Sequence, residues 1–578
     1  MSLRTTRGAR SSVSSTRSPR RPGAALRPRA GRQISGSTLA LLILLLIGVA
    51  APLTAVLARA VTGYRGQPSA LPDLLKPHMI EILGNTVLLG VLVVVIATFM
   101  AAPLAFLMSW TRLRDHRWID VLLMVPFMTP PYVAALAWLD FTRVNGLGEQ
   151  LFGPGGAVLR SVIESPFGMA LVIACESFTF LYLILRNHLD SVPASLDEVA
   201  TVTGASPWQR FTRILVPLSR PTFALGALII FIRAAGEFGT PVTLGNKIGF
   251  PVLVSEIYRN VTIDPLDFSS AAAYSCVLLT LGITVWGVQQ WMSRTQVPFG
   301  GRVARRTTVS GAALSVFGWA WLAVVTLLAV IIPYIAILIG SMTILRSQPA
   351  TLDNLTFDYF LIVLQPGAGL TGLQTSLVLA LVAASIATLI GIASALVVAR
   401  HRSGIGRLID WLAVASDTIP TIVLAIGFIF LWNSPWLPVT PYNTQAMVVI
   451  AYTVVLLPMV VQNVKGARAS IDSRLLEATA VSGATPLQAF TRVTLPLLLP
   501  GIVTGWLLAF LLGLREVVMS SLVRPASLDL LSPWIMSQFD QGNRAEALAM
   551  TVIGVFGSTV VFVIVDFWRR RQAERRLA

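Results

Sequence analysis

The stretch that decides the fold occurs twice in the chain. Residues 198–217 read EVATVTGASPWQRFTRILVP, and residues 477–496 read EATAVSGATPLQAFTRVTLP. Every matched position, from the first glutamate to the last proline, is separated by 279 residues. A repeat at so long a distance indicates a duplicated domain, since solenoid units recur every 20–50 residues or so.

The composition indicates a membrane protein. Of the 578 residues, 55% are hydrophobic and 12% are charged, whereas soluble domains carry about 25% charged residues. The mean hydropathy is +0.74. The two cysteines and four histidines are scattered along the chain, so we expect no disulfide framework, no metal site and no cofactor.

Apolar stretches that could cross a bilayer core of about 30 Å predict twelve transmembrane helices. They lie near 37–60, 81–108, 118–139, 165–187, 219–236 and 268–293, and again near 311–341, 373–399, 408–432, 444–463, 498–517 and 547–567. The predicted fold class is therefore an all-α integral membrane protein with two six-helix repeats. Because six is even, both repeats must have the same orientation and be parallel.

Basic residues predict the orientation and the domain boundaries. With the N-terminus inside, 32 of the 44 Lys and Arg residues fall in the inner segments, which is the positive-inside bias of membrane proteins. Both termini are then cytoplasmic. Residues 1–36 contain nine arginines and no acid, which predicts a disordered tail on anionic lipid rather than a nucleic-acid site. The predicted domains are 37–296 and 311–578, with a cytoplasmic linker at 297–310.

The repeated stretch follows the fourth predicted span of each half, on the inner side. We expect a short helix that ends at a left-handed glycine, then a second short helix with a capping box and proline in its first turn. The final proline should end this unit before the next span begins. A single copy would be adequately explained as an ordinary connection. Two matched copies indicate a partner with two equivalent binding sites.

This repeated stretch resembles the EAA loop of the inner-membrane permeases of binding-protein-dependent ABC importers. The resemblance covers both halves, and the fused layout is similar to that of ferric iron permeases; thiamine and aminoethylphosphonate permeases have similar layouts. Val199 and Thr479 stand where the family often has alanine, but small side chains pack there equally well. The resemblance implies the type I ABC importer permease fold, a cytoplasmic ATPase dimer docked on the loops and an external substrate-binding protein.

By the same resemblance, fourteen residues are expected to form the ATPase-coupling surface. They are Glu198, Ala200, Gly204, Ser206, Pro207, Arg213 and Pro217 in the first copy, and Glu477, Ala478, Gly483, Thr485, Pro486, Arg492 and Pro496 in the second.

The chain has no Gly-x-x-x-x-Gly-Lys-Ser/Thr phosphate-binding segment. We therefore expect a transport subunit without catalytic residues, with ATP hydrolysis on a separate subunit. Ferric iron is the expected cargo by resemblance, with thiamine, aminoethylphosphonate or polyamine as alternatives. An ion-coupled secondary transporter is the rival class, and it predicts broken helices around charged residues at mid-membrane.

Charged residues at the predicted outer ends of the fifth and eleventh spans form a second candidate site. Arg233 and Glu237 are four residues apart and are expected to share a helix face. Arg515 and Glu516 are adjacent, and Glu516 follows Glu237 by 279 residues. Because charges at membrane depth usually face a cavity or a bundle interior, we expect a gate or translocation path. A structural ion pair near the membrane surface explains these residues equally well.

Overall fold

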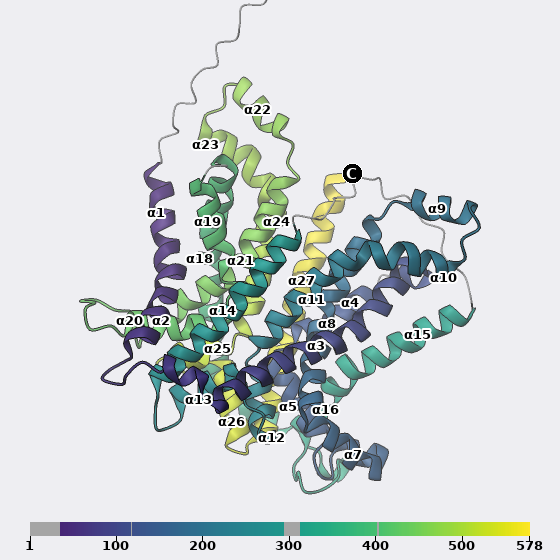
Figure 1. Cartoon of the computed structure of the whole chain (residues 1–578), viewed down its shortest axis with the longest axis vertical. Helices are drawn as coiled ribbons and strands as arrows, with labels where there is room; N and C mark the ends of the chain where they lie inside the picture. The colour runs from purple at the N-terminus through teal and green to yellow at the C-terminus, as the bar shows by residue number, and fades with distance from the viewer. Residues whose placement is uncertain (1–34, 117, 294–311, 402–403, 578) are drawn as a thin grey trace, which may run out of the picture.

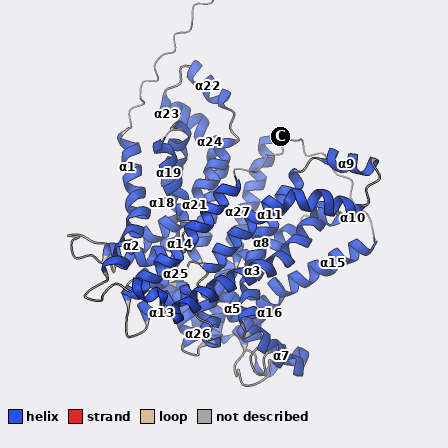
Figure 2. Ribbon diagram, viewed as in Figure 1, coloured by secondary structure: helices blue, strands red, loops and turns tan. Residues whose placement is uncertain are grey.

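The computed structural model describes residues 35–116, 118–293, 312–401 and 404–577. Within these ranges all regular elements are helices, and the two β-bridges are isolated (Figure 2). The fold class is therefore as predicted. The predicted tail, apart from its last two residues, and the predicted linker lie outside the described residues.

The helices of the two halves follow similar orders. The first half contains α1 (Gly36–Leu45), α2 (Ala51–Thr62), α3 (Pro77–Trp110), α4 (Trp118–Met128), α5 (Pro131–Phe141), α6 (Leu147–Phe152), α7 (Pro154–Ile163), α8 (Pro166–Ser191), α9 (Ala194–Val202), α10 (Pro207–Arg210), α11 (Val216–Ala235), α12 (Asn246–Ile248), α13 (Leu253–Thr262) and α14 (Phe268–Ser293). The second half contains α15 (Ala312–Thr326), α16 (Ile332–Met342), α17 (Asp358–Val363), α18 (Ala368–Arg400), α19 (Gly404–Ala415), α20 (Thr421–Trp432), α21 (Gln445–Ala469), α22 (Ser473–Val481), α23 (Pro486–Ala489), α24 (Leu495–Leu514), α25 (Val518–Val523), α26 (Leu531–Asp540) and α27 (Arg544–Leu577).

The number of continuous spans differs from the predicted twelve. In the described ranges, ten helices are long and apolar enough to cross a membrane. The other two expected spans are each divided into two shorter helices, α4 with α5 and α19 with α20. Pro130 and Pro420 precede the second helix of each pair. Proline has no N–H and pushes the preceding residue into an extended conformation, so each helix must restart there.

The first span of each half packs against the other half. Helices α1 and α2 contact α18, α19 and α20, whereas α15 and α16 contact α3 and α5. Each of these first spans is continuous through a π-helical turn, Leu46–Ala50 in one and Leu327–Ile331 in the other. The two repeats are thus interlocked rather than placed side by side.

Within each half, close helix packing uses equivalent glycines. In lipid, helices associate through tight contacts rather than through the hydrophobic effect. A Cβ added to Gly226 of α11 would lie 2.6 Å from Leu181 of α8. The matching residue of α24, Gly505, lies against the backbone of Val460 in α21, where a Cβ would approach to 3.1 Å. The same packing therefore positions the fifth span of both halves.

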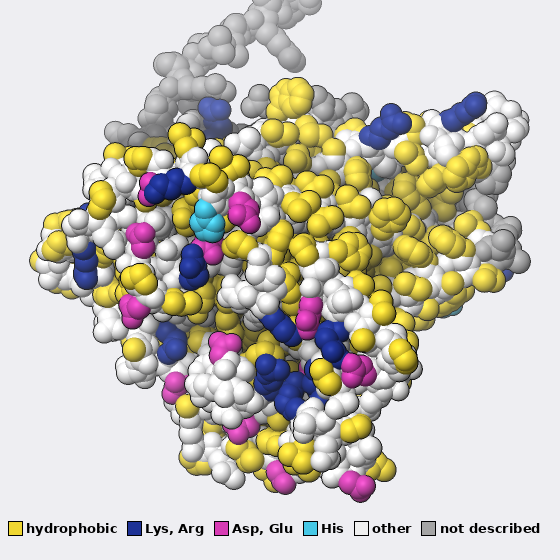
Figure 3. Space-filling view, turned by 60° about the horizontal axis from the view of Figure 1, so that its bottom comes forward, with side chains coloured by type: hydrophobic (Ala, Val, Ile, Leu, Met, Phe, Trp, Pro, Cys, Tyr) yellow, Lys and Arg dark blue, Asp and Glu magenta, His cyan; other side chains and the backbone are white. Residues whose placement is uncertain are grey.

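The two ends of the helical bundle differ in what they present. Helices α9, α10, α22 and α23 and the C-terminus lie at one end, here called the loop end (Figure 1). Helices α7, α12, α13 and α26 lie at the opposite end (Figure 1). Turning that opposite end toward the viewer shows acidic and basic side chains gathered on it, while hydrophobic side chains dominate the flank (Figure 3). Both copies of the repeated stretch are thus on the same face, as parallel repeats require.

Candidate functional site: the paired loops and the contact between the halves

Both loops turn at a glycine in the left-handed conformation. Gly204 has φ of 80° and Gly483 has φ of 73°. After α9, the N–H of Ala205 donates to the carbonyl of Ala200 at 2.9 Å, and the N–H of Gly204 donates to Thr201 at 3.0 Å. These two bonds define a Schellman motif, which satisfies the last carbonyls of the helix. The predicted glycine turn is therefore present in both copies.

The predicted capping boxes are also present. The N–H of Gln209 donates to Ser206 Oγ at 3.2 Å, and the Ser206 N–H donates to Gln209 Oε1 at 3.0 Å. Thr485 and Gln488 make the same reciprocal pair, at 3.3 Å and 3.0 Å. Each short second helix is therefore fixed at its first turn by its own side chains.

The expectation that Pro217 and Pro496 end the unit is wrong. The short helix continues into the fifth span through a π-helical turn, Phe211–Leu215 in the first half and Phe490–Thr494 in the second. Each proline lies in the first turn of the following α-helical stretch. Proline is tolerated there because the wider π-turn changes the local hydrogen-bond register. The loop is consequently continuous with the span, so a displacement of one must move the other.

Each loop presents two large apolar side chains at equivalent positions. Val202 is 88% exposed and Trp208 is 71% exposed in the first copy, and Val481 is 89% exposed and Leu487 is 71% exposed in the second. We call these four residues the apolar tips. The sequence analysis did not select them, although the match of Val202 with Val481 was visible at the 279-residue offset.

The other predicted coupling residues surround the tips. Ser206, Arg213, Thr485, Arg492 and Ala478 are exposed, whereas Ala200 is buried and Pro217 is partly buried. Pro496 is exposed. The backbones of Glu198 and Pro207 lie in α9 and α10, and those of Glu477 and Pro486 lie in α22 and α23.

The first loop is anchored to the end of α3. Arg210 donates from Nη1 to Thr201 Oγ1 at 3.0 Å, so it joins the two short helices, and its guanidinium lies 5.9 Å from the Trp110 ring centre. Phe211 packs edge-on against Phe106, with 4.8 Å between ring centroids. In the second copy Ala489 stands where the first has Arg210. The loops therefore share their tips but differ in how they are anchored.

Beneath the loops, an ion pair joins the third and fourth spans of each half. Arg186 of α8 pairs with Asp120 of α4, and the Tyr182 hydroxyl donates to the same carboxylate at 2.6 Å. Lys465 of α21 pairs with Asp410 of α19 at the equivalent place. We call these two contacts the basal ion pairs.

The expected pairing of Arg233 with Glu237 on one helix face is wrong. Helix α11 ends at Ala235, so the four-residue spacing does not place the two side chains one turn apart. The Glu237 carboxylate instead accepts the N–H groups of Gly239 and Thr240, at 2.7 Å and 3.0 Å. Glu516 accepts the N–H groups of Val518 and Ser520 in the same way, at 3.0 Å and 3.1 Å. Both glutamates therefore cap the segment that follows the fifth span of their half.

The two arginines instead join the halves. Arg233 lies 3.7 Å from Asp417, in the break between α19 and α20. Arg515 donates from Nη1 to the carbonyl of Thr129, at 3.3 Å, in the break between α4 and α5. Each arginine thus contacts the broken third span of the other half. Asp417 and Thr129 were missed in the sequence because only the fold brings them near the arginines; the signal was an acid or hydroxyl just before a proline.

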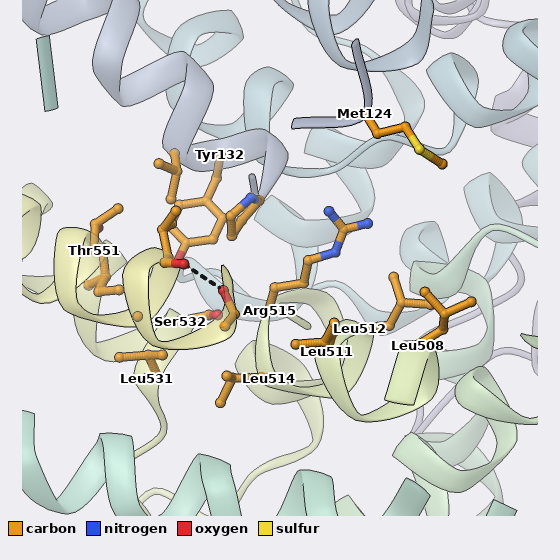
Figure 4. Close-up of a pocket in the computed structure, with 16 residues that line it drawn as sticks. Met124, Tyr132, Leu508, Leu511, Leu512, Leu514, Arg515, Leu531, Ser532 and Thr551 are labelled. Atoms are coloured by element: carbon orange, nitrogen blue, oxygen red, sulfur yellow. Dashed lines mark hydrogen bonds between the residues drawn. The ribbon is translucent and has the colours of Figure 1, made fainter. Parts of the chain in front are cut away.

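Arg515 also lies in the wall of a cavity between the halves. The cavity has an empty volume of about 880 Å³ and an almost entirely apolar lining, which includes Met124 from the first half and Leu512 from the second. Figure 4 shows the guanidinium of Arg515 extending beside Met124, away from the hydrogen-bonded pair Tyr132 and Ser532. Among the residues that the structure describes, no cluster of His, Cys, Asp and Glu could hold a metal ion.

An insertion in the first half forms a hairpin at the opposite end. Helices α6 and α7 are joined by an ion pair between Glu149 and Arg160. The N–H of Asn145 donates to Glu149 at 2.7 Å and lowers the pKa of that carboxyl below its usual value, as does the charge of Arg160. The residues of this hairpin lie in the region where the sequence of the first half is longer.

Comparisons with known proteins agree with the duplication. A family model described as the binding-protein-dependent transport system inner membrane component matches residues 93–298 and 387–577, more than half of the chain. The ferric transport system permease protein FbpB of Actinobacillus pleuropneumoniae is 23% identical over 92% of this chain and 77% of its own length. The Fe(3+)-transport system permease protein FbpB 2 of Haemophilus influenzae is 23% identical, over 91% of this chain and 97% of its own.

A shorter relative aligns with about one half. The sulfate transport system permease protein CysT of Escherichia coli is 27% identical over 32% of this chain and 68% of its own length. The relatives are thus membrane transport subunits rather than enzymes. With two interlocked helical repeats and two matches to one family model, this chain belongs to the family of binding-protein-dependent transport system inner membrane components.

Proposed function

We propose that this chain is the complete transmembrane subunit of an ATP-driven importer, in which each loop docks on one subunit of a cytoplasmic ATPase dimer. The observation that carries this proposal is the pair of equivalent apolar tips. Valine side chains that are 88% and 89% exposed at matched positions have no role in the packing of this chain. Large exposed apolar side chains in matched places indicate a protein contact.

The energy of such a contact is sufficient for docking. Burial of one valine and one larger side chain contributes about 1.5–3 kcal/mol for each residue, and both loops make this contribution. Two equivalent tips on one chain match a partner with twofold symmetry. Because each loop continues into the fifth span, closure of the ATPase dimer would pull directly on both halves.

The proposed orientation places the loop end in the cytoplasm and the opposite end toward an external substrate-binding protein. The basic residues support it, since most of them fall in the segments on the loop side of the spans. Both described chain ends lie at the loop end (Figure 1), and so both termini would be cytoplasmic.

Ferric iron is the proposed cargo. The support is the similarity along nearly the whole chain to two permeases named for ferric transport. Selection of the cargo is assigned to the binding protein, as the described residues offer no metal-binding cluster. Thiamine, aminoethylphosphonate and polyamine are the alternative cargoes.

We also propose that Arg233, Arg515 and the glutamate caps Glu237 and Glu516 form a gate between the halves. The arginines reach across to the broken third spans, so their contacts must change when the halves move apart. The caps hold the segment behind each arginine in place. An ion-coupled transporter would also need charged residues near broken helices, and the test below separates the two classes.

The experiment is purification from native membranes of the chain and of a variant with both Val202→Asp and Val481→Asp. An ATP-hydrolysing subunit should copurify with the unchanged chain and be lost from the variant, because charged side chains oppose burial in an apolar socket. Leu352→Asp, at a residue 89% exposed outside the loops, is the matched control and should retain the ATPase. Retention of the ATPase by the double variant, or uptake into vesicles without ATP, would contradict the proposal.

A further inference from the structure

An acid that the sequence analysis did not select lies in the middle of the fourth span. Glu176 follows Pro166, the first residue of α8, by ten residues, so it lies about 15 Å along a helix about 39 Å long. A carboxylate at that depth is costly unless opposite charges compensate it. The equivalent residue of the second half, 279 positions later, is Val455. The acid is therefore a feature of the first half alone.

The charges that compensate Glu176 come from both halves. The cations that act on it are Arg515 first and Arg233 second. In turn, Glu176 is the strongest attractive charge acting on Arg515. One carboxylate therefore serves an arginine of the second half and an arginine of its own half.

These groups form a line of alternating charge from one broken span to the other. It begins at Asp417 in the second half, continues through Arg233 and Glu176, and ends with Arg515 at the Thr129 carbonyl in the first half. Phe180, one turn after Glu176 on α8, lies 4.1 Å from the Arg233 guanidinium and fixes its position. Glu237 also acts on Glu176, but its carboxylate is held by backbone N–H groups.

The line crosses the contact between the halves where it is accessible. The side chains of Arg233 and Asp417 are 40% and 43% exposed, although they lie at the ends of apolar helices. Arg515 lies in the wall of the cavity between the halves (Figure 4). Separation of the halves would therefore have to break both arginine contacts.

We propose that Glu176 is a positioning residue that couples the two arginine contacts, so that both form and break together. This inference rests on the proposed gate. Without the shared carboxylate, each arginine would be left with its contact to its own broken span, and the two contacts would become independent. With it, loss of one contact changes the charge balance of the other.

The test is a double-mutant cycle of Asp417→Asn and Arg515→Gln, measured in the original chain and in the Glu176→Gln background. The complete complex with its ATPase is reconstituted in liposomes, and ATP-dependent uptake of ferric iron from loaded binding protein is the readout. In the original background the two changes should deviate from additivity by about fivefold or more, within the range seen for coupled residues. In the Glu176→Gln background the deviation should fall below about twofold.

Three controls make the result interpretable. Glu176→Asp keeps the charge and should restore most of the coupling, which a merely structural acid would not do. Glu81→Gln removes an exposed acid at the end of α3 and should leave the cycle unchanged. Thermal unfolding of each purified variant identifies any that fail to fold.

Two outcomes would overturn the inference. Equal non-additivity with and without Glu176 would show that the arginines communicate by another route, and additivity in the original chain would show that they do not communicate. In either case normal ATP-dependent uptake by the unchanged complex would leave the proposed function standing. Absence of any ATP-dependent uptake by that complex would remove both.

Discussion

At Gly204 and Gly483 the backbone adopts positive φ in open space, since a Cβ added at either residue would meet no atom within 4 Å. The penalty for another residue is therefore conformational rather than steric. An L-residue with a side chain pays about 1–2 kcal/mol in this region. The glycine determines the angle between the two short helices, and through it the direction in which the tips point.

Replacement of both glycines by alanine should weaken the loops without unfolding the bundle. We expect a local loss of about 1–2 kcal/mol per loop, seen as faster hydrogen exchange in α9 and α22 and as reduced copurification of the ATPase. Asparagine, which tolerates the left-handed region, should have a smaller effect.

The matched control for this change is Gly466→Ala. Gly466 lies in α21 and also has open space around its Cβ position, but its φ is not positive. Alanine should be neutral or slightly stabilising there. Equal effects of alanine at positions 204, 483 and 466 would show that the left-handed turn is unimportant.

Single residues also show where sequence reasoning stops. The capping pairs Ser206 with Gln209 and Thr485 with Gln488 were predictable because the interacting residues are three apart. Asp417 and Arg233 are far apart in sequence, so their contact depends on how the halves pack. Glu176 could have been found by inspection of each span for an isolated acid, but its two arginine partners could not.

At the scale of elements, the basal ion pairs show that the two halves are equivalent in position but not in strength. Arg186 is 16% exposed and shares Asp120 with a tyrosine hydroxyl, whereas Lys465 is 36% exposed. An arginine also holds a carboxylate in a more defined geometry than a lysine does. The first half should therefore depend more on its pair.

We expect Asp120→Asn to destabilise the protein more than Asp410→Asn. Removal of Asp120 leaves a poorly exposed arginine without its carboxylate, and the loss should be about 1–3 kcal/mol. The more exposed second pair should lose about 1 kcal/mol or less. The measurement is the midpoint of thermal unfolding in detergent.

High salt gives a second comparison, since it screens an exposed pair more than a partly buried one. The difference between Asp410→Asn and the unchanged chain should therefore shrink with salt, while that of Asp120→Asn should persist. Identical losses for the two variants at low salt would contradict the proposed difference in strength.

The elements themselves were largely predictable, because long apolar runs must be helical in a membrane. The third span of each half was not, although its prolines were visible. The expectation of one helix from 118 to 139 and one from 408 to 432 ignored the missing N–H of Pro130 and Pro420. Likewise, Pro217 and Pro496 were taken as helix ends, but a π-helical turn carries the helix past them. Local sequence rules do not specify such a change of register.

At the scale of the whole molecule, the feature that the sequence does not reveal is the interlocking of the repeats. The apolar pattern of residues 37–60 predicts a span but not its neighbours, which prove to be α18, α19 and α20 of the other half. At the opposite end, Asp140 of α5 pairs with Arg346 of the second half and with Arg143. The Asp140 side chain is only 5% exposed. The halves are thus held together by apolar contacts along the spans and by buried charge at one end.

This arrangement predicts how the chain behaves when it is divided between Ser293 and Ala312. Each half alone would expose the helix surfaces that the first span of the other half covers, and it would leave one side of the Asp140 and Arg346 pair buried without compensation, which costs about 3–5 kcal/mol. The halves should therefore be unstable when expressed singly but should copurify and restore transport when expressed together. Asp140→Asn should weaken the divided protein more than the fused one, because a covalent link keeps the halves at high effective concentration. Size-exclusion chromatography and uptake measure these effects, and a single half that unfolds at the same temperature as the full chain would show that interlocking contributes nothing to stability.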